Sequence, residues 1–190
     1  MKYDPYKHHR RSIRLKGYDY TQEGAYFVTI SSKNGEPIFG HVENDVMILN
    51  EWGLVVQREW EKTAVLRSNV NLGVSQIMPT HFHGVLWIWK PFPHAIKSGL
   101  PRQFGRPEKE SLGTIVGAFK SAVTYGINKL RQVKGVSVWH RNYFEQIIRN
   151  EEHLTAVSQY IINNPATWES DKLHPDAPLN KFNRAWREGK

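Results

Sequence analysis

The chain has 190 residues, 39% of them hydrophobic, which is enough to bury one core but too few for a second full domain. It contains no cysteine, which excludes disulfides, thiolate zinc sites and cysteine nucleophiles, so any metal site must use histidine, carboxylate or amide ligands. Lys and Arg number 26 against 18 Asp and Glu, a formal net charge of +8 that favours a polyanion, nucleic acid above all, as partner. Without a stretch of about 18 apolar residues or an apolar secretory segment, we expect a cytoplasmic protein.

The first 20 residues are basic and lack hydrophobic periodicity. We expect residues 1–20 to form an arm that contacts phosphates, and a solvated, solubilising tail is an equal interpretation. Residues 21–170 are predicted to form the folded domain, and residues 171–190 a polar C-terminal tail. The candidate phosphate contacts of the arm are Arg10, Arg11, Arg14 and Lys16.

Periodicity and turn signals predict the elements of the domain in chain order. A β-rich run at residues 25–32 indicates a strand, and residues 40–49 resemble a hairpin around Asn44-Asp45. The later elements are a helix at 50–67, adjacent strands at 70–78 and 81–89 in the centre of a sheet, a helix at 111–132, a strand at 136–149 and a helix at 150–164.

Local signals mark several of these boundaries. Asn50 and Ser111 are suitable N-caps for the first two helices, and Pro165 stops the third. The alternation of strands and helices predicts an α+β fold, a ferredoxin-like sandwich whose central antiparallel sheet has its helices packed on one face.

His81 and His83 form the sharpest local feature. Residues two apart on a strand project from the same face, so both imidazoles can converge on one ion. With oxygen ligands completing the shell, such a pair can hold Mg or Mn as a Lewis acid on a phosphate. On this spacing alone, ordinary surface or core histidines are the alternative.

Tyr160 and Asn164 form the second feature, because the i,i+4 spacing puts both side chains on one face of the last helix. If that helix packs near the histidines, Tyr160 can reach a scissile phosphate and the Asn164 amide oxygen can complete a metal shell. The alternative is that Tyr160 lies at the edge of the core and that Asn164 simply ends the helix before Pro165.

Four segments together resemble one known family. MPTHFHGVLWI resembles the His-hydrophobic-His strand of the single-tyrosine HUH transposases, and RNYFEQIIRNEEHLTAVSQYIINNP resembles their tyrosine block, ending in Tyr-Ile-x-x-Asn-Pro. HHRRSIRLKGYDY with AYFVTI, and LGTIVGAFKSAV, resemble the insertion-sequence and REP-associated branch. The likeness is co-linear and spans most of residues 5–170.

The resemblance implies metal-dependent cleavage and rejoining of single-stranded DNA through a 5′-phosphotyrosine intermediate. Carried onto this chain, Tyr160 is the nucleophile, the metal ligands are His81, His83 and Asn164, and residues 21–170 are the HUH transposase-like catalytic domain. The third ligand in the family is usually Gln rather than Asn. The family also tends to have a histidine where this chain has Gln146.

Hairpin or single-stranded DNA is therefore the expected partner, in a cytoplasmic protein that associates with the nucleoid when bound to DNA. Lys120, Lys129 and Arg131, on or just after the second long helix, are further phosphate-contact candidates. Relatives work as dimers or as monomers, and a homodimer is the assembly we carry forward. A catalytically silent hairpin-binding protein and a phosphodiesterase using activated water are the rival functions.

Overall fold

The computed structural model describes residues 18–89 and 110–184, and within them four strands form one antiparallel sheet in the order β4-β5-β1-β6. The elements in chain order are β1 (Gly24–Ser31), β2 (Gly40–Glu43), β3 (Val46–Leu49), α1 (Glu51–Val65), β4 (Val70–Ile77), β5 (His81–Ile88), α2 (Leu112–Leu130), β6 (Phe144–Ile148) and α3 (Glu151–Asn163). Short 3-10 turns cover Lys33–Gly35 and Pro165–Ser170.

The connectivity confirms the expected ferredoxin-like arrangement. β1, α1 and β4 make one crossover, β5, α2 and β6 make the other, and each central strand lies between the two strands of the other crossover. β2 and β3 form the separate hairpin that was predicted. Its two turn residues, Asn44 and Asp45, have φ values of 50° and 63°, as a tight hairpin turn requires.

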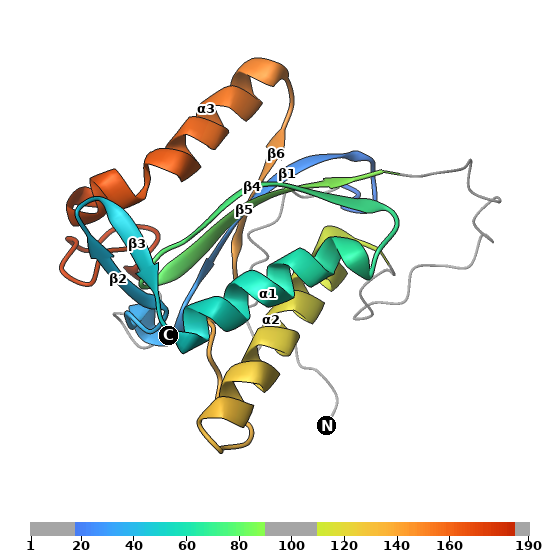
Figure 1. Cartoon of the computed structure of the whole chain (residues 1–190). Coiled ribbons are helices and arrows are strands. Elements are labelled where there is room, and N and C mark those ends of the chain that lie inside the picture. Colours follow the sequence, from blue (N-terminus) through green and yellow to red (C-terminus); the bar gives the residue numbers. More distant parts are fainter. Residues whose placement is uncertain (1–17, 90–109, 185–190) are drawn as a thin grey trace, which may run out of the picture.

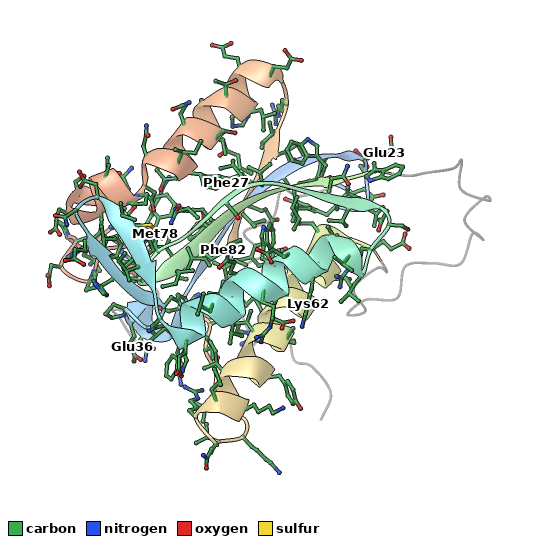
Figure 2. The ribbon with its side chains drawn as sticks, viewed as in Figure 1. Glu23, Phe27, Glu36, Lys62, Met78 and Phe82 are labelled. Carbon is green, nitrogen blue, oxygen red and sulfur yellow. The ribbon has the colours of Figure 1, made fainter. Side chains whose placement is uncertain are left out.

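Both faces of the sheet are covered, because β5 is buried at seven of its eight positions. Phe82 points to the face of α1 and packs against Trp60, with ring centroids 4.7 Å apart. Phe27 points to the other face, towards α3, as Figure 2 shows. The large cluster under α1 and α2 and the smaller one under α3 therefore share one sheet (Figure 1).

The expectation that all helices pack on one face is therefore wrong for α3. α1 and α2 cover one face as predicted, and α3 covers the other through Val157 and Ile161. The physical reason is that β1 and β5 carry apolar side chains on both faces, and a single helical layer leaves one of those faces in water. This second face is the one on which His81 and His83 lie.

The helix boundaries follow the local signals. Asn50 accepts hydrogen bonds from the amides of Trp52 and Gly53, and Ser111 accepts one from Thr114. Both predicted N-caps are therefore confirmed.

Two strand predictions need correction. β4 is an edge strand rather than a central one, because β1 takes the other side of β5. The strand expected at 136–149 is shortened to β6, with only a bridge between Trp139 and Ser32 before it. Side chains of α2 take the carbonyls that a ladder would need: Lys120 binds those of His140 and Arg141, and Asn128 binds that of Val136.

Candidate active site

The two histidines lie at the start of β5, deep under α3. His81 is fully buried, His83 is 1% exposed, and their ring centroids are 4.5 Å apart. The register with β1 sets His81 opposite Ser31 and His83 opposite Thr29. The strand alternation therefore brings both rings to one face, as the sequence predicted.

Each imidazole is oriented by a threonine hydroxyl at its Nδ1 atom. Thr29 Oγ1 lies 2.9 Å from His83 Nδ1, and Thr80 Oγ1 lies 3.0 Å from His81 Nδ1. Thr80 donates its only proton to the carbonyl of Leu173, so its oxygen accepts from the Nδ1–H of His81. His81 is then the tautomer whose Nε2 carries a free lone pair.

That Nε2 lone pair faces another acceptor. Asn164 Oδ1 lies 3.2 Å from His81 Nε2, while Asn164 Nδ2 donates to Asp171 Oδ2 at 2.9 Å, which fixes the orientation of the amide. Burial lowers the pKa of His81 and the carboxylate of Asp171 opposes this, so the neutral ring is favoured. Two lone pairs that face each other beside a carboxylate are an arrangement that a cation stabilises.

Asp171 is the residue that sequence reasoning missed. His81, His83 and Asp171 each offer a ligand atom, and these atoms all lie within 4.8 Å of one another. Asp171 falls in the segment expected to be a polar tail, yet it is 8% exposed and Leu173 beside it is 4% exposed. The 3-10 turn Pro165–Ser170 leads the chain back to the histidines, and no sequence spacing predicts that Asp171 lies beside them.

Tyr160 lies on α3 above His83. Its hydroxyl is 3.3 Å from His83 Nε2, and its ring meets Phe27 edge-on at 6.2 Å between centroids. Burial, with the charge of Asp171, raises the pKa of Tyr160 to about 12, so the phenol is protonated at neutral pH. Burial also places the pKa of His83 well below its usual value, and a proton on the neighbouring His81 would lower it further.

A pocket of about 600 Å³ opens beside Tyr160 and His83. Phe27 and Phe144 contribute to its sheet side, and Lys172, Lys181 and Phe182 of the C-terminal segment contribute a cationic, aromatic side. The ammonium groups lie 5.9 Å and 4.9 Å from the centre of the Phe182 ring, respectively. This surface suits an unpaired base with its phosphate.

The structure thus brings together Tyr160, His81, His83 and Asn164, and leaves the other candidates elsewhere. Lys120 donates to a backbone carbonyl, and Arg131 donates to Asn128 Oδ1 and to a backbone carbonyl. Lys129 is exposed on α2. The remaining candidates, Arg10, Arg11, Arg14 and Lys16, lie outside the described residues.

Solved structures place this architecture in a known class of fold. The structure of a REP-associated tyrosine transposase bound to a REP hairpin matches 94% of this chain and 87% of that chain, with a TM-score of 0.54. The sequence identity is 16%, so the match establishes that the two chains share a fold.

Sequence comparison then gives the family. An uncharacterized protein of Haemophilus influenzae is 41% identical over 181 residues, covering 92% of this chain and 98% of that protein. The chain therefore belongs to the same family as the Haemophilus protein. No protein-family model matches the sequence. Within residues 18–89 and 110–184, no helix is long and apolar enough to span a membrane.

Proposed function

We propose that this protein is a metal-dependent single-stranded DNA transposase that cleaves and rejoins DNA with Tyr160 as the nucleophile. The observation that carries the proposal is the 3.3 Å approach of the Tyr160 hydroxyl to His83, whose ring lies in a buried cluster with His81, Asn164 and Asp171. The motif order and the fold shared with a REP-associated tyrosine transposase support the same reading.

His81, His83 and Asp171 are the residues that would hold a divalent cation, Mg or Mn, with the Asn164 amide oxygen beside them. The donor set fits, because it combines two oriented neutral imidazoles with a carboxylate and an amide oxygen. When bound, such an ion polarises the scissile phosphate and offsets the charge that develops on it. Asp171 joins the ligands that the sequence suggested.

The protein's own contribution is to place a nucleophile. The phenolic oxygen of Tyr160 forms a bond to phosphorus while the bond from phosphorus to the 3′ oxygen breaks. The phenolic proton passes to water, which reaches the half-exposed side chain, and the departing oxygen takes up a proton to become a free 3′-OH. The 5′-phosphotyrosine link conserves the bond energy, so the reverse step rejoins DNA without ATP.

The DNA partner is proposed to be single-stranded or hairpin DNA. The net charge of +8 and the lysines beside the pocket provide the attraction, and the solved neighbour is bound to a REP hairpin. We further propose that the protein is cytoplasmic and associates with the nucleoid when it is bound to DNA. The proposed assembly is a homodimer.

The test is incubation of the protein with labelled hairpin oligonucleotides from the flanks of its gene, with Mg or Mn, followed by a denaturing gel. We expect a metal-dependent, protease-sensitive covalent adduct that Tyr160→Phe abolishes. Tyr125→Phe is the matched control, because it removes an exposed phenol on α2. Cleavage that survives Tyr160→Phe would instead identify hydrolysis by water, and binding without cleavage would identify a silent hairpin-binding protein.

A further inference from the structure

A second hollow, of about 880 Å³, lies between the C-terminal half of α2 and residues 133–141. We call it the α2 groove. It lies apart from the pocket that holds Tyr160, and within residues 18–89 and 110–184 the two share no lining residue. The residues of the groove that matter here are Lys120, Tyr125, Lys129, Lys134, His140 and Arg141.

The described residues that line the α2 groove carry charge of one sign. They include Lys129, Lys134 and Arg141, and no Asp or Glu is among them. Tyr125, 73% exposed and one helical turn before Lys129, adds an aromatic face beside these cations. A polyanion with flat apolar groups satisfies both features, and single-stranded nucleic acid is such a molecule.

The walls of the groove are held in place by hydrogen bonds. Lys120 donates to the carbonyls of His140 at 2.8 Å and Arg141 at 2.9 Å, which ties the loop to α2. Arg131 donates to Asn128 Oδ1 and to the carbonyl of Val136, which ties the loop after α2 to the end of that helix. The hollow is therefore formed before any ligand arrives.

The groove also lies close to the Tyr160 pocket along the chain. Arg141 lines the groove and Phe144 lines the pocket, so two residues separate the two linings, a Cα-to-Cα span of at most about 11 Å in extended chain. The backbone amide of His140 donates to the carbonyl of Ser31, whose strand partner is His81. Arg141 is therefore the groove residue that lies nearest to the pocket along the chain.

We propose that the α2 groove binds the single-stranded DNA that flanks the cleaved phosphate, with an unpaired base on Tyr125 and phosphates at Lys129, Lys134 and Arg141. This deepens the proposed function, on which it rests for the position of the cut. The protein then holds its substrate at two places joined by the segment from Arg141 to Phe144.

The test measures binding of fluorescent oligodeoxythymidylates of about 6 and about 16 nucleotides, a span that covers one or two such sites. The protein background is Tyr160→Phe, so that no covalent adduct interferes. We expect the longer probe to bind more tightly than the shorter one. Lys129→Glu should weaken the affinity for the longer probe by about tenfold, and should lower the salt dependence of that affinity by the amount that about one phosphate contact contributes.

Lys62→Glu is the matched control. Lys62 is the basic residue in the last turn of α1, as Lys129 is in that of α2, so both variants make the same change in net charge at a helix end (Figure 2 labels Lys62). Lys62→Glu also breaks the ion pair with Glu59, so circular dichroism checks that this variant stays folded. Tyr125→Ala should also weaken binding of the long probe, and Tyr125→Phe should restore it, because stacking needs the ring and not the hydroxyl.

Equal effects of Lys129→Glu and Lys62→Glu on the long probe would overturn the proposal. A Lys129 dependence found with a hairpin stem but absent with the thymidylates would overturn the single-stranded assignment. The proposed function is read separately, from the covalent adduct of the wild-type chain. If that adduct never forms while Lys129→Glu still weakens the long probe, the groove stands and the transposase proposal fails.

Discussion

At the scale of single residues, the phenol of Tyr160 is held in its protonated form. Burial and the Asp171 charge raise its pKa to about 12, above the value of about 10 in an unfolded chain. The folded state therefore retains this proton, and its contribution to stability is present below about pH 10 and lost as the pH rises towards 12.

The ultraviolet absorbance of the phenolate measures this directly. The difference between alkaline titrations of the metal-free wild type and of Tyr160→Phe should have a midpoint near 12. In an Asp171→Asn background the midpoint should move to lower pH, because the negative charge that opposes formation of the phenolate is removed. A midpoint at or below 10 would contradict the raised pKa of this hydroxyl beside His83.

A second prediction concerns the cation ligands. Mn or Mg should raise the melting temperature of the wild type, because an ion that binds only the folded state stabilises it. His81→Ala should remove the effect, and Asp171→Asn should weaken affinity by at least about tenfold. Isothermal titration measures the affinity, and circular dichroism verifies the fold of each variant.

Asp176→Asn is the control for Asp171→Asn, because it neutralises a carboxylate of the same segment whose side chain is 94% exposed. If the two variants bind metal alike, Asp171 is no ligand.

His81 and Asn164 could be predicted from the sequence, because strand alternation, helix periodicity and the family resemblance are local patterns. Asp171 could not, since its approach depends on a turn whose path no periodicity encodes.

At the scale of elements, the closeness of α1 to the sheet can be tested at Gly84 in β5. A Cβ there would lie 2.7 Å from Trp60 and 2.8 Å from Phe82, both aromatic rings of the core. Gly84→Ala should lower the free energy of unfolding by about 1–3 kcal/mol, the usual cost of overpacking.

Gly117→Ala in α2 is the matched substitution. A Cβ at Gly117 meets nothing within 4 Å, so this variant should gain about 0.5–1 kcal/mol from helix propensity. Urea denaturation followed by circular dichroism measures both. Equal losses in the two variants would mean that α1 does not pack on Gly84 as described.

Some features of the elements could be predicted from the sequence, and others depend on contacts between distant residues. Helix starts were predictable because Asn50 and Ser111 act through their own neighbouring amides. The side of the sheet that α3 covers was not predicted, although the apolar residues on both faces of β5 indicate that both faces are covered. The shortening of β6 depends on Lys120, a contact between residues 20 positions apart.

At the scale of the whole molecule, the two faces of the sheet differ in how much they bury. Among the described residues, the cluster under α1 and α2 contains 21 buried residues and the cluster under α3 contains five. Since local opening is easiest where little apolar surface is buried, α3 should open without global unfolding. The helix that carries Tyr160 is thus the less stable part of the fold.

Native-state hydrogen exchange tests this difference. Amides of α3 should exchange through an opening of lower free energy than amides of α2, with β1 and β5 at the global limit. Adding Mn should slow exchange in α3 more than in α2. Asn164, the C-cap of α3, lies 3.2 Å from His81 on β5, so a cation held between them would tie the helix to the sheet. The same experiment on His81→Ala should leave α3 unchanged by Mn. Equal protection of both helices in the metal-free protein would mean that the two faces unfold as one unit.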